Sequence, residues 1–148
     1  MKSFSKKHFS KNPEETWKIA KEFSKTLSNS AVIALHGDLG AGKTCFIQGL
    51  AQGLGIKEPI TSPTYTLIDE YTGKKNLVHM DLYRLSNSLE AIGIGLEEYF
   101  NQDSIIAIEW AERAEDLLPK NIIHVNIEYA KNPLERSIEI FKKEDLCG

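Results

Sequence analysis

The sequence predicts a three-layer α/β fold in which a mostly parallel central sheet lies between helices and the chain ends in a β-hairpin. Three observations carry this prediction. Short apolar runs, at residues 31–35 and 104–108, are typical of strands that are buried on both faces. Segments with apolar residues at helical spacing alternate with these runs. A glycine-rich turn connects the first buried run to one of the predicted helices.

Length and composition predict one soluble domain that spans residues 1–148. A chain of 148 residues buries roughly 68–70% of the surface that its unfolded form exposes, so it needs no disulfide or metal ion to fold. The hydrophobic content of 41% and the net charge of −3 exclude a disordered chain. Cys45 and Cys147 are too few for a disulfide scaffold. No apolar run approaches the roughly 20 residues of a membrane span, so we expect no membrane association.

The near balance of charges argues against autonomous binding of nucleic acid, which usually requires a basic face. Residues 1–8 are basic but no apolar stretch follows them, so no export signal is visible and a cytoplasmic location is expected. Four histidines are scattered without the spacing of metal ligands, and surface or strand positions are predicted for them: His8, His36, His79 and His124.

The first predicted helix begins at Asn12 and ends near residues 29–30. Asn12 is a good N-cap, Pro13 suits the first helical position, and Glu15 at the third position can close a capping box. Apolar residues at helical spacing predict a buried stripe, formed by Trp17, Ala20, Phe23 and Leu27.

The same patterns predict the later elements. A helix is expected at about 43–54, and Gly53 and Gly55 mark its end. The others are, in order, a loop at 60–65, strands at 66–71 and 76–82, a helix at 86–100 interrupted near Gly93 and Gly95, a buried strand at 104–108, and a hairpin of strands 121–129 and 136–141.

Residues 37–44 match the phosphate-loop pattern G-x-x-x-x-G-K-[ST] in full, between a predicted strand and a predicted helix. Glycines let successive backbone N–H groups face phosphate oxygens, and the helix N-terminus adds a favourable dipole. Lys43 can reach the β- and γ-phosphates, and the Thr44 hydroxyl can ligate Mg²⁺. The pattern therefore predicts a P-loop NTPase-type fold that binds a nucleotide through Gly37, Asp38, Leu39, Gly40, Ala41, Gly42, Lys43 and Thr44.

Two further predicted strands end in carboxylates, at Asp81 and Glu109. In an open α/β sheet, ligands bind at the carboxyl ends of the strands, so both acids should reach the edge that carries the phosphate loop. One acid can hold Mg²⁺ and the other can orient the attacking water, and the residues alone do not assign the two roles. Asp38 is unfavourable beside phosphates unless it points away, meets metal-bound water or positions a nucleophile.

A loop rich in hydroxyl side chains lies between the phosphate-loop helix and the first acidic strand. Ser62 and Thr64 in this loop suit a contact with Mg²⁺ or the γ-phosphate, as in the switch segments of P-loop proteins. An ordinary Ser/Thr turn is the alternative interpretation.

The function classes that fit these motifs are an ATPase, a P-loop small-molecule kinase, and a nucleotide-dependent assembly switch with negligible turnover. The three arginines, Arg84, Arg113 and Arg136, are too far apart in sequence for the clustered lid of a kinase. No N-K-x-D tetrapeptide for reading guanine is present, which favours ATP over GTP.

The motifs together resemble the bacterial TsaE family, in its order and at similar separations, from about residue 12 to 141. Four segments carry the resemblance: 37–44, Ser-Pro-Thr-Tyr-Thr-Leu at 62–67, Asp-Leu-Tyr-Arg-Leu at 81–85, and Glu-Trp at 109–110. The resemblance implies a Mg²⁺-dependent ATPase required for threonylcarbamoyladenosine modification of tRNA. It also implies slow turnover that the TsaB–TsaD heterodimer stimulates, with tRNA contacted mainly through those partners.

The resemblance also implies roles for particular residues. It makes Lys43 the phosphate-binding lysine, Thr44 and Glu109 the Mg²⁺ ligands, and Asp81 an aspartate important for ATPase function. Nucleotide contacts are implied for Thr16 in the first helix and Arg136 at the start of the last strand. Cys45 stands where the family commonly has a second threonine.

Overall fold

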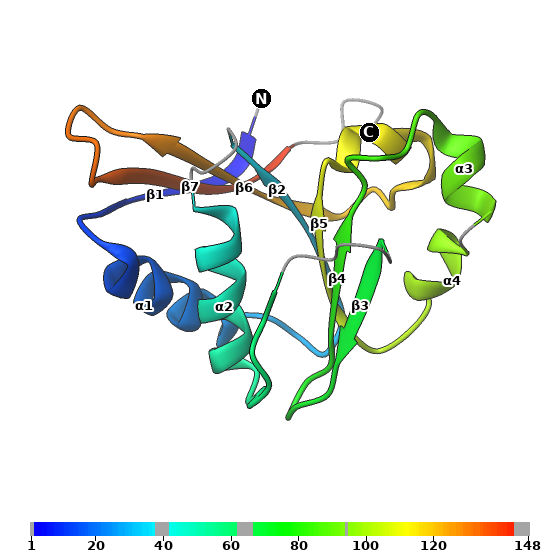
Figure 1. The fold of residues 1–148 in the computed structure, drawn as a ribbon, viewed down its shortest axis with the longest axis horizontal. Coiled ribbons are helices and arrows are strands. Elements are labelled where there is room, and N and C mark those ends of the chain that lie inside the picture. Colours follow the sequence, from blue (N-terminus) through cyan, green and yellow to red (C-terminus); the bar gives the residue numbers. More distant parts are fainter. Residues whose placement is uncertain (1, 38–41, 62–66, 94, 144–148) are drawn as a thin grey trace.

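The computed structural model describes residues 2–37, 42–61, 67–93 and 95–143. Within this part of the chain, seven strands form one sheet in the order β1-β7-β6-β2-β5-β4-β3 (Figure 1). The four central strands, β6, β2, β5 and β4, are parallel, whereas β1, β7 and β3 run antiparallel to their neighbours. The strands are β1 (Lys2–Ser10), β2 (Ala31–His36), β3 (Ile68–Tyr71), β4 (Leu77–Asp81), β5 (Ile105–Glu109), β6 (Ile122–Tyr129) and β7 (Arg136–Lys143).

Helices cover both faces of the sheet, which confirms the predicted three-layer α/β fold. They are α1 (Pro13–Ser24), α2 (Lys43–Gly53), α3 (Ser88–Gly93), α4 (Leu96–Tyr99) and the 3₁₀ helix η1 (Ala111–Leu117). Alternate side chains of a strand point to opposite faces, so β2 contributes to two cores. Ile33 and Leu35 pack with α1 and α2, while Val32 and Ala34 pack with the side of α3, α4 and η1. Figure 1 shows these two groups of helices well apart.

Helix α1 begins as predicted and ends earlier than predicted. The Asn12 side chain accepts a hydrogen bond from the Glu15 N–H at 2.9 Å, and the Glu15 carboxylate accepts one from the Lys11 N–H at 3.1 Å. The helix ends at Ser24 because Ser24 and Thr26 donate their hydroxyl protons to the carbonyls of Lys21 and Phe23, at 2.6 and 2.7 Å. Such local side-chain bonds compete with continued helix.

Strand β1 is the main element that the sequence patterns do not predict. It pairs antiparallel with β7, from Lys2↔Lys143 to Ser10↔Arg136, and forms one edge of the sheet. Its sequence KSFSKKHFS has no buried apolar run, and its partner lies more than a hundred residues away along the chain. Lysines on an edge strand are a common protection against pairing with other chains.

The remaining predicted elements are found with small changes. The predicted helix at 86–100 is divided into α3 and α4, and Gly95 at φ 75° caps α4 in a left-handed conformation that favours glycine. The terminal hairpin is confirmed as β6 and β7, whereas η1 was not predicted. No helix that the structure describes is long and apolar enough to cross a membrane.

Helices α1 and α2 touch at Gly49, where a side chain has no room. A Cβ atom at this position would lie 2.6 Å from both the Cα and the carbonyl oxygen of Trp17. We therefore expect Gly49→Ala to lower the free energy of unfolding by about 1–3 kcal/mol, as overpacking does in tight cores. Urea denaturation measures this change. Gly93→Ala is the matched control because a Cβ there meets nothing within 4 Å, and an equal loss in both variants would contradict the packing argument.

Candidate functional site

The topology brings the phosphate-loop lysine to the two strand-end carboxylates. Helix α2 begins at Lys43, strand β4 ends at Asp81 and the neighbouring parallel strand β5 ends at Glu109. Asp81 and Glu109 are paired in register across these two strands. Lys43 Nζ lies 3.9 Å from Glu109 Oε1. The predicted meeting of the three residues at one sheet edge therefore agrees with the geometry.

Two glycines of the phosphate-loop pattern are described by the structure. Gly37 at φ 146° and Gly42 at φ 107° both adopt positive φ values that favour glycine. Within the part of the chain that the structure describes, no side-chain hydrogen bond caps α2 at Gly42. Thr44 follows in the first turn and is half-buried. The predicted contacts of Asp38, Leu39, Gly40 and Ala41 fall outside the described residues, as do those of Ser62 and Thr64.

Lys43 and Glu109 are both nearly buried, with exposed fractions of 8% and 5%. Burying charged groups is costly unless each is paired and hydrogen-bonded. The second carboxylate oxygen of Glu109, Oε2, lies 2.8 Å from Nε2 of His79, which is completely buried on β4. Glu109 is thus held between a lysine and a histidine.

His79 is the site residue that the sequence patterns missed. A carboxylate only accepts hydrogen bonds, so the Nε2–H group of His79 donates the hydrogen bond and Glu109 Oε2 accepts it. The other ring nitrogen, Nδ1, has no hydrogen-bond partner among the described residues. A strand position was predicted for His79 and is confirmed. Its spacing of two residues from Asp81 was the available signal, because that spacing places both on one face of a strand.

Asp81 differs from Glu109 in its surroundings. It is half-buried, and its Oδ1 atom accepts a hydrogen bond from the Tyr83 N–H at 3.0 Å. The backbone N–H of Leu82, which lies between Asp81 and Tyr83, donates a hydrogen bond to the Glu109 carbonyl at 3.0 Å. The turn after β4 is therefore tied both to Asp81 and to the end of β5. The two acids are adjacent, but only Glu109 is enclosed.

Trp110 forms one wall of the site directly after Glu109. It is the one non-glycine residue with positive φ, 59°, in the part of the chain that the structure describes. Such a conformation costs about 1–3 kcal/mol and is often found at functional sites. The Trp110 ring centroid lies 5.4 Å from Lys43 Nζ, 5.6 Å from Arg113 Cζ and 5.0 Å from the Tyr83 ring. The half-buried indole therefore lies between the buried lysine, the half-buried Arg113 and the exposed Tyr83.

Thr16 lies on α1 and is 3% exposed. Its Oγ1 atom is 2.7 Å from the Ser10 Oγ atom. The Ser10 hydroxyl donates to the Asn12 carbonyl at 2.7 Å, so the Thr16 hydroxyl is the donor in the Ser10–Thr16 pair. The predicted nucleotide contact of Thr16 remains a prediction.

Arg136 opens β7 and is paired in register with Ser10 of β1, near Thr16. Its guanidinium lies 4.2 Å from the Tyr129 ring centroid. Burial raises the pKa of the Cys45 thiol above its ordinary value, the Glu14 carboxylate adds to the rise, and the Arg136 charge opposes it. The Cys45 Sγ atom, in the first turn of α2, lies 3.5 Å from the Pro13 carbonyl oxygen, so the start of α1 lies beside that turn. The predicted nucleotide contact of Arg136 remains a prediction.

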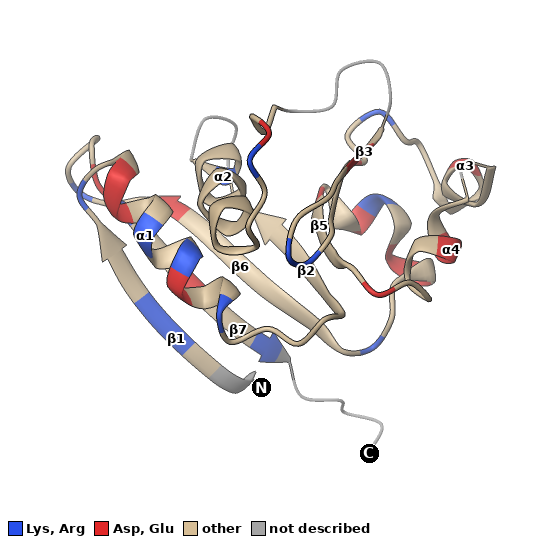
Figure 2. Ribbon diagram, turned by 90° about the horizontal axis from the view of Figure 1, so that it is seen from below, with Lys and Arg blue, Asp and Glu red and all other residues tan. Residues whose placement is uncertain are grey.

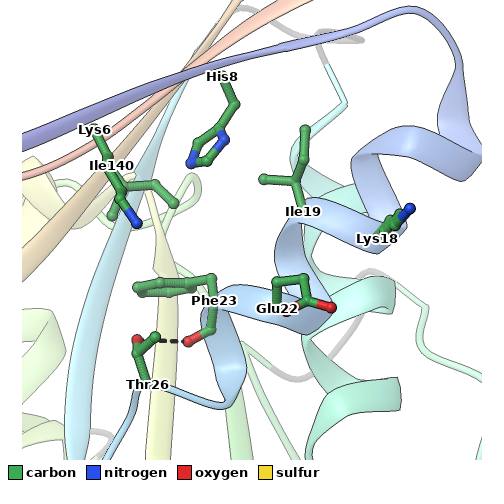
Figure 3. Close-up of a pocket in the computed structure, with 8 residues that line it drawn as sticks. All are labelled: Lys6, His8, Lys18, Ile19, Glu22, Phe23, Thr26 and Ile140. Carbon is green, nitrogen blue, oxygen red and sulfur yellow. Dashed lines mark hydrogen bonds between the residues drawn. The ribbon is translucent and has the colours of Figure 1, made fainter.

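A separate cavity of about 450 Å³ lies between β1 and α1 (Figure 3). Its lining, among the described residues, includes none of the predicted site residues: it is formed by Lys6, His8, Lys18, Ile19, Glu22, Phe23, Thr26 and Ile140. Partial burial lowers the pKa of His8, and the neighbouring Lys6 charge adds to this effect. The cavity is therefore distinct from the Lys43–Glu109 site.

The family model "Threonylcarbamoyl adenosine biosynthesis protein TsaE" matches residues 10–138. The tRNA threonylcarbamoyladenosine biosynthesis protein TsaE of Haemophilus influenzae is 40% identical, over 87% of this chain and 84% of its own. The proteins of the same name from Bacillus subtilis and a Nostoc species are 44% and 45% identical, over 80% and 83% of this chain and 75% and 78% of theirs. The crystal structure of Bacillus subtilis YdiB superimposes with a TM-score of 0.79 and 38% identity, over 95% of this chain and 87% of that one.

Proposed function

This chain belongs to the TsaE family of threonylcarbamoyl adenosine biosynthesis proteins, and we propose that it is a Mg²⁺-dependent ATPase required for threonylcarbamoyladenosine modification of tRNA. One observation carries the proposal. The phosphate-loop lysine, at the start of α2, meets a buried carboxylate at the end of a neighbouring parallel strand. This arrangement suits the binding of a metal–nucleotide complex, because it combines N–H donors, a cation and an acidic metal ligand.

The residues present fit Mg²⁺ bound together with ATP better than Mg²⁺ bound alone. No group of three or more His, Cys, Asp or Glu side chains that could hold a metal occurs among the described residues. Magnesium commonly uses only one or two protein ligands and takes the others from phosphates and water. Thr44 and Glu109 supply such a pair, since both lie at the sheet edge beside Lys43.

Each residue has a distinct task in the proposed reaction. Lys43 binds the β- and γ-phosphates and neutralises charge that builds up on them. Bound Mg²⁺ supplies the positive charge that polarises the phosphoryl group. His79 holds Glu109 Oε2 and so directs the rest of the carboxylate, in the way that outer partners orient metal ligands. Asp81, fixed by the Tyr83 N–H, orients the attacking water.

We also propose the partner, the cellular location and the route of contact with tRNA. The TsaB–TsaD heterodimer is the partner that stimulates slow intrinsic hydrolysis in the cytoplasm. Contact with tRNA occurs mainly through these partners, because this chain carries a net charge of −3. Thr16 and Arg136 bind the nucleotide, and Ser62 and Thr64 sense the γ-phosphate.

Phosphate release from Mg·ATP, measured with and without TsaB–TsaD, tests the proposed function. We expect slow release by the chain alone and faster release with the heterodimer. A parallel screen offers small-molecule phosphate acceptors. Efficient phosphorylation of a metabolite would identify a kinase instead, and tight ATP binding without any release would identify a switch.

The contact between His79 and Glu109 gives a further prediction. His79→Leu leaves a buried carboxylate oxygen without its donor, so we expect Mg²⁺-dependent turnover to fall about 10–100-fold, as for other outer partners of metal ligands. His79→Gln keeps an N–H donor at a similar reach and should recover part of the activity. The Mg²⁺ concentration for half-maximal turnover measures the effect, beside urea unfolding of each variant. Equal loss in both variants would show that the hydrogen bond is not the reason for the effect.

A further inference from the structure

An open groove of about 670 Å³ lies between α3 and η1. Leu89 and Ile92 on α3 line it and are 76% and 52% exposed, which is unusual for two large apolar side chains on one short helix. The remaining lining is formed by Ser86, Asn87, Ser88, Glu112, Arg113, Asp116 and Leu117. Exposed apolar groups that are rimmed by polar ones are typical of protein interaction sites.

The two helices that form the groove carry more acidic than basic side chains. Four acidic residues on α3 and η1 are exposed, namely Glu90, Glu112, Glu115 and Asp116, and the one basic residue on these helices, Arg113, is half-buried. Figure 2 shows red segments on both α3 and α4. A surface of this charge repels the phosphates of nucleic acid and attracts lysine and arginine side chains.

The groove adjoins the candidate nucleotide site. Arg113 lines the groove and also lies 5.6 Å from the Trp110 ring centroid, while Lys43 Nζ is 5.4 Å from the same centroid. A protein bound in the groove would therefore be separated from Trp110, the wall of the candidate site, by the Arg113 side chain. This position suits a partner that responds to the nucleotide.

We propose that the α3–η1 groove is the docking surface for a protein partner that presents lysine or arginine side chains around an apolar centre. The inference rests on the proposed function, in which that partner is the TsaB–TsaD heterodimer. The apolar centre would cover Leu89 and Ile92, and the basic side chains would pair with Glu112 and Asp116. Apolar anchors inside a charged rim are the usual organisation of such interfaces.

Binding to the TsaB–TsaD heterodimer, measured by biolayer interferometry, tests the surface. We expect the double variant Leu89→Ser/Ile92→Ser to weaken binding about tenfold or more, as loss of a central apolar anchor does. Glu112→Lys/Asp116→Lys should weaken it as well and reduce its dependence on salt. Leu134→Ser is the matched control, since Leu134 is 75% exposed but lies between β6 and β7, and it should bind like the wild type.

ATP binding and urea unfolding of each isolated variant separate this inference from the proposed function. All variants should bind Mg·ATP and unfold like the wild type, because the substituted side chains are exposed and outside the site. Double variants that bind the heterodimer as tightly as Leu134→Ser would overturn the surface. A wild-type chain that hydrolyses ATP but does not bind the heterodimer would overturn both the proposed partner and the proposed docking surface. Self-association that depends on Leu89 and Ile92 would overturn the proposal in favour of a second copy as the occupant.

Discussion

Replacing Lys43 by alanine is expected to reduce ATP hydrolysis by about 10²–10³-fold, the usual cost of removing one preorganised group that stabilises transition-state charge. Lys43 is the one lysine that both follows the phosphate-loop glycines and lies 3.9 Å from Glu109. Its loss removes the cation that would meet the phosphates in a nearly dry site. Steady-state phosphate release, together with the dissociation constant for ATP, measures the change.

The matched control for this prediction is Lys57→Ala, which removes an exposed lysine beyond the end of α2. It should leave turnover unchanged. Lys43→Ala also leaves Glu109 without its nearby cation, so the unfolding free energy of each variant must be measured beside its activity. Unchanged turnover in a folded Lys43→Ala protein would remove Lys43 from the mechanism.

Replacing Glu109 by glutamine is expected to abolish most of the Mg²⁺-dependent activity, by about 10²-fold or more. Glutamine has nearly the same shape, and its amide oxygen can still accept the hydrogen bond from His79. The variant therefore removes the negative charge and little else. We expect a higher Mg²⁺ concentration for half-maximal turnover, measured by titration at saturating ATP.

Glu115→Gln is the control for the charge change, because Glu115 is exposed on η1. It should titrate with Mg²⁺ like the wild type. A Glu109→Gln protein with an unaltered Mg²⁺ requirement would instead make Asp81 the principal acid. The different surroundings of the two acids lead us to expect the first result, since only Glu109 is enclosed with a cation and a histidine donor.

Much of this site could be predicted because parallel strands end at a common edge. The apolar runs before Asp81 and Glu109 indicated buried strands, and the phosphate-loop pattern indicated where α2 begins. Those two facts are enough to bring Lys43 to the sheet edge at which both acidic strands end. The buried runs also predicted the central strands, because a strand covered on both faces is apolar at every position.

The missed features depend on partners that are distant in sequence. The polar strand β1 exists because β7 pairs with it, and nothing local distinguishes its residues from a loop. His79 meets Glu109 thirty residues later, so its spacing of two residues from Asp81 indicated the face of the strand but not this partner. The same limit applies to Arg136, which is paired in register with Ser10 although the two residues lie at opposite ends of the chain.

The most direct test of the account is a crystal structure of this chain with Mg²⁺ and a slowly hydrolysed ATP analogue. We expect the β- and γ-phosphates at the start of α2 against Lys43, with the metal held by Thr44 and by Glu109, directly or through one water. His79 should keep its bond to Glu109. A nucleotide bound elsewhere, or a metal that contacts Asp81 and leaves Glu109 with Lys43 and His79 alone, would contradict the account.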